Sequence, residues 1–410
     1  MGRLKALLQR TIFYQFYLQL VKRYRFRVQD KQYPRIYRRY AKRPVDPHKV
    51  LFLEIHHPAL SNSFRQVYAA LAQDGSFRLR CHYLLHTSTP PRRQRKVFRR
   101  FLKDLATARA LFLDEGTDLL SHVPVRKETA VIQLWHGCGA FKKFGLSVAD
   151  RKFGADADYM KDHPFHSHYS LVTVSSPEVV WAYAEAMGYP EDSGVIRPTG
   201  VSRTDVFFDE MFLRSAKEHL LAAVPQAKGR RVLLYAPTFR GNIREAAAPT
   251  VLDIASLQAA VGEGSVLLIK HHPHVRHRPP VPESCRTFAF DVTDSLTIED
   301  LLCVSDVCIS DYSSLVFEYS LFERPMVFLA DDLDDYFDWR GFYYDYRELA
   351  PGPVVQTTAE LIDVLTYPDT HFDVARVRAF KEKFMSACDG HATARILDDI
   401  GLIKTEPDRA

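Results

Sequence analysis

Short apolar runs alternate with amphipathic stretches through most of this 410-residue chain, from Lys49 onward. The runs are almost continuously apolar, which is typical of strands in a parallel sheet with both faces covered. They form two series, at 49–55, 77–85, 110–115, 129–135, 170–176 and 194–200, and then at 231–237, 265–273, 287–292, 306–310 and 325–330. Helical patterns lie between them, for example at 64–73, 177–187, 297–304 and 313–322. We therefore expect an α/β protein with two doubly wound, Rossmann-like domains.

The passage from one series to the next predicts the domain organisation. It falls within 205–230, which contains a helical stretch after "SRTD" and the turn "VPQAKGR". We expect an N-terminal arm at 1–48, a first Rossmann-like domain at 49–215, a second at 216–375 and C-terminal helices at 376–410. Ligands of such sheets bind beyond the carboxyl ends of the strands, so we look for chemistry there.

Positive charge is concentrated at the N-terminus. Residues 1–43 carry thirteen Lys and Arg residues against Asp30 alone, interleaved with aromatic and aliphatic residues. A basic helical arm of this kind suits an anionic membrane surface. A solvated helix packed on the domain behind it is the alternative. We expect no nucleic-acid binding, because the rest of the chain has no basic aromatic pattern.

Three features of the sequence bear on the cellular location of the protein. No run of 18 or more apolar residues appears, which predicts no transmembrane helix, and no secretory signal is evident. The six cysteines form no CxxC pair and are typical of reduced, cytoplasmic thiols.

The first strand end of interest is "QLWHGCGAFKKFG" (133–145). His136 directly follows a strand, and the glycines beside it permit a tight turn and close ligand approach. A histidine held there can act as a general base, because its pKa lies near working pH. Lys142 and Lys143 can attract phosphate. The alternative is a histidine whose ring only caps the turn.

Two further strand ends carry cations. In "LLYAPTFRGN" (233–242), Thr238 and Arg240 follow the strand, and Arg binds phosphate oxygens bidentately; a surface salt bridge is the alternative. In "LLIKHHPHVRH" (267–277), Lys270 and His272 follow the strand. Its histidines are not a recognisable metal-ligand set on an irregular, Pro-broken loop, so we favour phosphate contact and expect no metal.

The fourth strand end is "SDYSSLVFEYSLFERP" (310–325). Asp311 precedes Ser313 and Ser314, which fall at a helix N-terminus, where backbone N–H groups favour an anion. Ordinary N-capping by serine is the alternative. Glu318, one turn into the helix, can accept hydrogen bonds from a polyol, or is a charge on the helix surface. Upstream, "TIED" predicts a capping box that begins at Thr297.

Four anion-suited strand ends on two sheets predict a cleft between the domains that binds a phosphorylated nucleotide. The chain contains no GxxxxGK[ST], which argues against a P-loop ATPase. It also contains no GxGxxG, which argues against a dinucleotide oxidoreductase.

The order of these motifs resembles the CDP-glycerol glycerophosphotransferase family, the teichoic-acid primases and polymerases of bacterial cell walls. The likeness covers about 50–370 and rests on "QLWHGCGAFKKFG", "PTGVSRTDVF", "LLYAPTFRGN", "DVTDSLTIEDLLCVSDVCISDYSSLVFEYSLFERPMVFL" and "RGFYYDYRELAPGP". Members often have "WHGTPLKKLG", whereas this chain has Cys138 and Gly139 in place of Thr and Pro.

The resemblance implies a GT-B-like fold, with an acceptor domain followed by a CDP-donor domain. It implies transfer of glycerol phosphate, or a related alditol phosphate, from CDP-glycerol or another CDP-alditol to a hydroxyl of a lipid-linked glycan acceptor, with release of CMP. The enzyme would be peripheral, at the cytoplasmic face of the cell membrane, without a cofactor. The family pattern makes His136 the catalytic base, Arg240 and His272 contacts of the donor pyrophosphate, Ser313 and Ser314 phosphate-binding serines, and Glu318 an acid near the donor hydroxyls.

Two other classes of function remain open from the sequence. A GT-B glycosyltransferase that uses a nucleotide-sugar shares the architecture and the anion-suited strand ends. An inactive, membrane-associated relative is the other, although the presence of His136, Arg240, His272 and both serines argues against it.

Overall fold

The computed structural model describes residues 20, 23–24, 27–84, 91–149, 162–242, 245–262, 264–339 and 341–404. Nearly half of the expected arm at 1–48, namely 1–19, 21–22 and 25–26, lies outside the described residues. Within the part of the chain that is described, no helix combines the length and the apolar character needed to cross a membrane.

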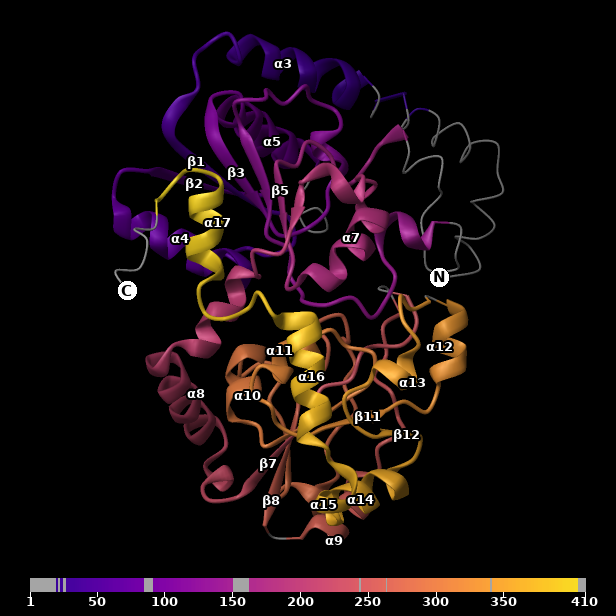
Figure 1. The fold of residues 1–410 in the computed structure, drawn as a ribbon. Coiled ribbons are helices and arrows are strands. Elements are labelled where there is room, and N and C mark those ends of the chain that lie inside the picture. The colour runs from indigo at the N-terminus through magenta and orange to yellow at the C-terminus, as the bar shows by residue number, and fades with distance from the viewer. Residues whose placement is uncertain are drawn as a thin grey trace. The chain divides into compact units, whose positions relative to one another are not determined.

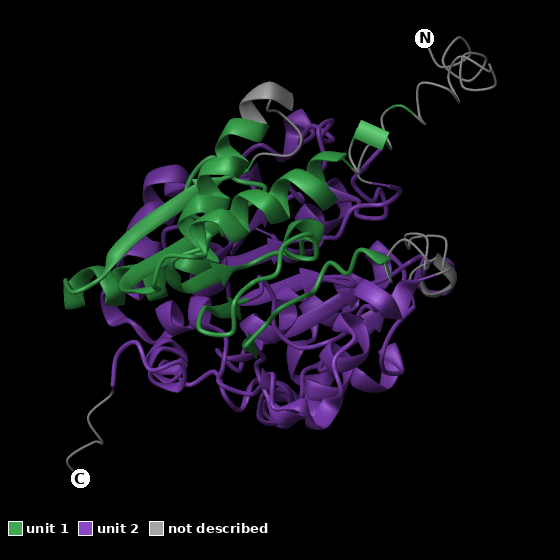
Figure 2. Cartoon of the chain, turned by 90° about the horizontal axis from the view of Figure 1, so that it is seen from above, with its two compact units in different colours: residues 1–134, 158–172 green, residues 135–157, 173–410 purple. Residues whose placement is uncertain are grey.

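The chain forms two compact units (Figure 2). Unit 1 comprises Met1–Leu134 and Asp158–Val172, and unit 2 comprises Trp135–Ala157 and Thr173–Ala410. The elements of unit 1, where η marks a π-helical or 3-10 segment, are η1 (Arg27–Gln32), α3 (Tyr33–Tyr40), β1 (Asp46–Glu54), α4 (Asn62–Asp74), β2 (Arg78–Tyr83), α5 (Pro91–Leu105), β3 (Ala108–Leu113), η2 (Asp118–Leu120), β4 (Ala130–Gln133) and β5 (Leu171–Thr173), which ends at the boundary.

The first sheet has the strand order β2-β1-β3-β4-β5-β6, and Figure 1 labels its strands β1, β2, β3 and β5. The pairs β1–β2, β1–β3, β3–β4 and β4–β5 are parallel. The inner strand β1 has a run of fully buried residues from Val50 to Leu53, as expected for a strand covered on both faces. Helix α5 buries Phe98, Phe101, Leu102 and Leu105, which share one helical face, and Tyr33 of α3 packs on Phe98 with ring centroids 4.4 Å apart.

Unit 2 contains the remaining elements. They are η3 (Gly145–Val148), η4 (Pro177–Val179), α7 (Val180–Met187), η5 (Glu191–Ser193), β6 (Ile196–Arg197), η6 (Ser202–Phe208), α8 (Glu210–Ala223), η7 (Pro225–Ala227), β7 (Arg231–Tyr235), α9 (Ile254–Val261), β8 (Ser265–Ile269), η8 (Glu283–Cys285), β9 (Ala289–Asp291), α10 (Ile298–Val304), β10 (Val307–Ser310), α11 (Leu315–Ser320), β11 (Met326–Leu329), α12 (Leu333–Trp339), α13 (Tyr346–Leu349), β12 (Val354–Val355), α14 (Thr358–Thr366), α15 (Pro368–His371), α16 (Val374–Met385) and α17 (Ala392–Asp399).

The second sheet has the order β12-β11-β10-β7-β8-β9, and all its pairs are parallel. Alternate residues such as Leu233, Ile269 and Ile309 form one core cluster with residues of α9 and α14. The residues between them, such as Leu234 and Cys308, are buried on the opposite face, where α10 contacts β7 and α11 contacts β10. Both faces are thus covered, which explains the continuous apolar runs in the sequence.

The expectation of an α/β fold with two parallel, Rossmann-like sheets is confirmed. The chain passes from the first sheet to the second between β6 and β7, through α8. The expected capping box is present, with Thr297 accepting from the Asp300 N–H and the Asp300 carboxylate accepting from the Thr297 N–H. The strand expected at 194–200 is reduced to Ile196–Arg197, because Pro198 has no N–H to donate to a sheet. The domain limits 49–215 and 216–375 stay predictions.

Candidate active site

Four strand ends of unit 2 meet at one edge of the second sheet. Strands β11, β10, β7 and β8 are neighbours in that order and all run parallel, so their carboxyl ends lie on the same side. Three of these ends carry motifs that the sequence singles out, after Tyr235, Ile269 and Ser310. The sheet therefore collects these motifs on one edge of unit 2.

Asp311 links the ends of β10 and β7. It is almost fully buried, and its two carboxylate oxygens accept hydrogen bonds from the Thr238 N–H (2.8 Å), the Thr238 hydroxyl (3.0 Å) and Arg240 Nη1 (2.9 Å). Burial raises the pKa of Asp311, and the nearby Arg240 guanidinium opposes that rise. These contacts make Asp311 the residue that holds the "TFRG" loop on the "DYSS" loop.

Arg240 is engaged by two carboxylates. Its Nε and Nη2 donate to the two oxygens of Asp332, beyond the end of β11, and its Nη1 donates to Asp311. Burial lowers the pKa of Arg240, but the Asp311 and Asp332 carboxylates outweigh that effect and raise it. The side chain keeps about a fifth of its surface exposed. Arg240 is thus a fixed cation at this edge, and its contact with a donor pyrophosphate stays a prediction.

The two serines occupy the start of α11. Ser314 is the residue before the helix, and its side chain makes no capping hydrogen bond among the described residues. The Ser313 hydroxyl accepts from the Leu315 N–H over a long 3.4 Å. Ser314 is exposed and Ser313 half-buried. Strong N-capping by serine, the alternative to a binding role, is therefore not what the geometry shows.

The turn that contains His136 packs directly on this helix. A Cβ added at Gly137 would lie 3.3 Å from the Ser314 hydroxyl oxygen, and one added at Gly139 would fall 2.2 Å from the Phe317 ring. Gly139 also has a φ of +63°, which side-chain-bearing residues rarely adopt. His136 is exposed and its ring stacks on Trp135, with centroids 4.4 Å apart. Glycine at both positions lets the His136 turn pack against Ser314 and Phe317.

Arg203 is hydrogen-bonded to the backbone of this turn. Its Nη1 donates to the His136 carbonyl (2.7 Å), its Nη2 donates to Glu299 (2.7 Å), and its Nε forms a 3.1 Å ion pair with Glu318, without hydrogen-bond geometry. The side chains of Arg203, Glu299 and Glu318 are 12%, 6% and 5% exposed. One buried cation therefore connects the His136 turn to α10 and α11.

Glu318 lies inside the protein. Burial raises its pKa to about 7, the Arg203 guanidinium opposes this, and the Glu299 carboxylate adds to it. Burial lowers the pKa of Arg203, whereas Glu318 and Glu299 raise it above its ordinary value. Glu318 is not the helix-surface charge that the sequence left as an alternative, and its contact with donor hydroxyls stays a prediction.

The end of β8 carries the next two expected residues. Lys270 is half-buried, and its ammonium donates to the carbonyls of Thr293 (2.7 Å) and Leu296 (2.6 Å); burial lowers its pKa. The His272 ring packs on Phe239 with centroids 4.8 Å apart, and its Nδ1 accepts from the His274 N–H. A neutral His272 therefore carries its proton on Nε2 and can donate from there.

The two lysines of the His136 motif differ in their surroundings. Lys143 lies 3.9 Å from a Glu185 oxygen and over the Tyr343 ring. Lys142 pairs through its backbone with Phe342 and is close enough to Asp311 to lower the pKa of that carboxyl. Lys142 is therefore the one whose charge acts on the shared edge of the sheet.

Sequence reasoning missed Arg203 and Asp332. Arg203 lies in "PTGVSRTDVF", a motif that carries the family likeness but to which no role was given. The presence of an arginine in a motif that carries the family likeness was the available signal. Asp332 follows β11 in "LADDLDD", a fifth strand end that presents an acid rather than a cation.

The solved structures that resemble this chain show its fold. The wall teichoic acid polymerase TagF matches with a TM-score of 0.75 at 22% identity, covering 95% of this chain and 97% of that one. The expected GT-B-like, two-domain fold is confirmed by this likeness.

The family follows from the sequence. Residues 35–402 match the model of the CDP-glycerol:poly(glycerophosphate) glycerophosphotransferase family, and this chain belongs to that family. It is 38% identical to the teichoic acid ribitol-phosphate primase of Bacillus spizizenii over 88% of this chain and 93% of the relative. It is 35% identical to the ribitol-phosphate polymerase TarK of Staphylococcus aureus, covering 86% and 68%, and 27% identical to the glycerol-phosphate primase of Bacillus subtilis, covering 78% of each. The expected phosphotransferase of teichoic-acid biosynthesis is thereby confirmed.

Proposed function

We propose that this enzyme transfers ribitol phosphate from CDP-ribitol to a hydroxyl of a lipid-linked teichoic-acid precursor and releases CMP. The observation that carries the proposal is the packing of the His136 turn on Ser314 within one compact unit. Ribitol is favoured over glycerol because the relatives named for ribitol phosphate are 33–38% identical over 86–88% of this chain. Those named for glycerol phosphate are 27–32% identical over 42–78% of it.

The proposed reaction is an in-line displacement at phosphorus. His136 is exposed and follows a strand end, so it accepts the proton of the acceptor hydroxyl as that oxygen attacks the ribitol-bearing phosphorus. The bond from that phosphorus to the CMP oxygen breaks, and CMP departs with the bonding electrons. Proton and charge balance without an oxidant, a reductant or a cofactor.

The shared edge of the second sheet supplies the positive charge and the donors. The Ser313 and Ser314 hydroxyls, His272 Nε2–H and the Arg240 guanidinium hold the phosphate oxygens of the donor. Asp311 and Asp332 fix the orientation of Arg240, and Lys142 adds charge nearby. Lys270 acts mainly by holding the turn before α10, through Thr293 and Leu296.

Glu318 and Arg203 are proposed as positioning residues. Arg203 holds the His136 carbonyl, and Glu318 with Glu299 holds Arg203. Donor contact by Glu318 requires its carboxylate to turn away from Arg203. That contact is part of the proposal because Glu318, on α11, comes one helical turn after Ser314, the residue that precedes the helix.

Acceptor binding is assigned to the first Rossmann-like domain, and attachment to the cytoplasmic membrane face to the basic residues 1–43. Thirteen cations against one acid, each contributing on the order of 1 kcal/mol near an anionic surface, support the second assignment.

The test is a donor comparison. The purified enzyme is incubated with a synthetic lipid-linked acceptor and CDP-ribitol or CDP-glycerol, and CMP is measured. We expect acceptor-dependent CMP from CDP-ribitol, loss of at least about 10²-fold in His136→Ala, and no loss in His277→Ala, an exposed histidine of another loop. Faster turnover of CDP-glycerol would refute the donor assignment. Release of a nucleoside diphosphate from a nucleotide-sugar would place the chain among glycosyltransferases.

A further inference from the structure

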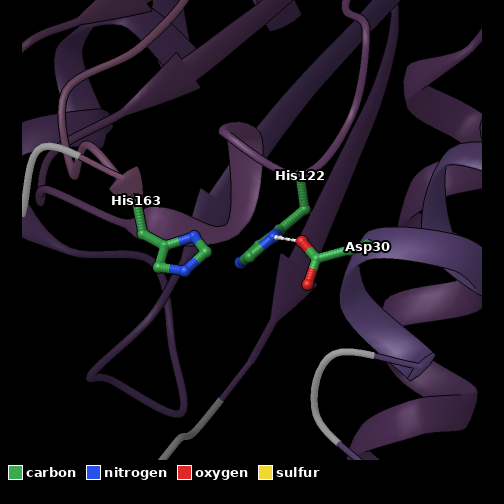
Figure 3. A group of neighbouring side chains, drawn as sticks. All are labelled: Asp30, His122 and His163. Carbon is green, nitrogen blue, oxygen red and sulfur yellow. Dashed lines mark hydrogen bonds and ion pairs between the residues drawn. The ribbon is translucent and has the colours of Figure 1, made fainter. Parts of the chain in front are cut away.

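Asp30, His122 and His163 meet in unit 1, whereas the active-site residues discussed above lie in unit 2. Asp30 lies on η1, His122 follows η2, and His163 lies in the loop before β5. One ligand atom from each lies within 4.8 Å of the others (Figure 3). Among the described residues, this is the one group of three or more His, Cys, Asp or Glu side chains with that geometry.

The hydrogen bond to Asp30 determines the state of the His122 ring. His122 Nδ1 lies 2.7 Å from Asp30 Oδ1. A carboxylate accepts, so Nδ1 carries the proton and Nε2 of the neutral ring has a lone pair. Carboxylate–histidine pairs of this kind orient histidines that bind metals.

His122 Nε2 is buried and has no hydrogen-bond partner among the residues that the structure describes. The side chain as a whole is only 4% exposed. Buried polar atoms are normally satisfied, so such a nitrogen calls for an explanation. Figure 3 shows the His122 ring between the other two residues, with one ring nitrogen toward Asp30 and the other toward His163. The two imidazole rings have centroids 5.1 Å apart and are tilted by 38°.

We propose that His122, through Nε2, and His163 bind a divalent transition-metal ion of the Zn²⁺ type, with Asp30 as the carboxylate that holds the His122 ring. Imidazole nitrogen is a preferred donor for Zn²⁺, whereas Mg²⁺ and Ca²⁺ prefer oxygen. Ligand atoms around tetrahedral Zn²⁺ are about 3.4 Å apart, so small side-chain rotations bring the two rings to the ion. Water or other groups complete the coordination.

The three segments come from distant parts of the chain, 92 residues apart in the case of Asp30 and His122. A metal here would attach η1, which lies within the basic arm, to the rest of unit 1. The role is structural, and it is separate from the proposed chemistry at His136.

The test measures zinc directly on the full chain, purified without a histidine tag. After equilibrium dialysis against Zn²⁺, elemental analysis is expected to give about one zinc per chain, and Zn²⁺ is expected to raise the unfolding temperature. His163→Ala, at a half-buried loop position, removes a ligand with little effect on packing, so it should fold, lose the zinc and lose the temperature shift. Asp30→Asn should bind about 10- to 100-fold more weakly.

Two control variants make the result specific. His274→Ala removes an imidazole from the histidine-rich loop of unit 2, and His48→Ala removes an exposed one from unit 1; both should retain the zinc. The proposal is overturned if the unaltered chain retains no zinc, if folded His163→Ala binds it equally well, if Asp30→Asn binds with unchanged affinity, or if His274→Ala abolishes binding.

Discussion

Replacing Arg203 with methionine should damage unit 2 more than any surface change. The substitution removes the cation between Glu299 and Glu318 and the donor to the His136 carbonyl, while keeping much of the side-chain volume. Two buried carboxylates then face each other without a counter-charge. Breaking a buried ion pair in this way typically costs about 3–5 kcal/mol, so we expect a loss of that size in the free energy of unfolding at pH 8.

The loss should depend on pH in a defined direction. The pKa of Glu318 is already raised to about 7 by burial and is held down by Arg203. Without Arg203 the pKa rises further, so Glu318 in the folded variant is protonated at pH 6. A carboxyl whose folded pKa is raised contributes stability that is fully present below its unfolded pKa and is lost as pH rises from there through the folded pKa. Because the folded pKa is higher in the variant than in the unaltered chain, the variant loses more between pH 6 and pH 8. The penalty in Arg203→Met should therefore be smaller at pH 6 than at pH 8.

Tryptophan fluorescence is a suitable assay, because Trp135, Trp181 and Trp339, the three tryptophans of the chain, all lie in unit 2. Urea unfolding would be followed at both pH values for the unaltered chain, Arg203→Met and Arg214→Met, an exposed arginine on α8. Adding Glu318→Gln to Arg203→Met should restore part of the stability at pH 8. A loss below about 1 kcal/mol, or one equal to that of Arg214→Met, would refute the reasoning.

Three further outcomes are expected. Ser314→Ala should lower the rate of CMP release while leaving unfolding within about 0.5 kcal/mol of the unaltered chain, because its exposed hydroxyl makes no capping bond among the described residues; a stability loss above 1 kcal/mol would reveal a capping role instead. Gly139→Ala should destabilise unit 2 more than Gly194→Ala when both are unfolded in urea, because both have positive φ but a Cβ meets the Phe317 ring only at Gly139; equal losses would contradict a tight approach. Burial raises the pKa of Asp114 to about 7, so its stabilising contribution falls as pH rises from 4 to 8. Asp114→Asn should flatten that dependence by up to about 4 kcal/mol in hydrogen exchange of unit 1, and an unchanged slope would argue against the raised pKa.

The sheets could be predicted because buried parallel strands leave a direct trace in the sequence. The inner strands β7 and β8 of the second sheet are buried on both faces, so residues 232–235 and 266–269 read as continuous apolar runs. The helix at 297–304 could also be predicted from the sequence, because Thr297 and Asp300 form a local capping box. The ends of strands were predicted less accurately. In β6, for example, Pro198 ends the pairing earlier than the predicted strand at 194–200.

The candidate site could be predicted only in part from the sequence, for a physical reason. Residues that follow strands could be found because parallel strands deliver their ends to one edge. The partners of those residues could not, because pairing across the fold has no local period. Arg203 is 96 residues from Glu299, and Arg240 is 92 residues from Asp332. Glu318 was assigned to a ligand or to solvent, and its burial against Arg203 became visible only in three dimensions.

The boundary between the two units has a consequence for how the proposed base meets its substrate. The chain leaves unit 1 at Leu134 and enters unit 2 at Trp135, one residue before His136. His136 and the serines of the "DYSS" loop therefore belong to the same compact unit, whatever the orientation of the two units. In the proposed reaction, the distance between the His136 ring and the donor phosphate is then set by packing within unit 2, at Gly137 and Gly139. The acceptor hydroxyl is then the one reactant of the proposed reaction whose position this packing does not set.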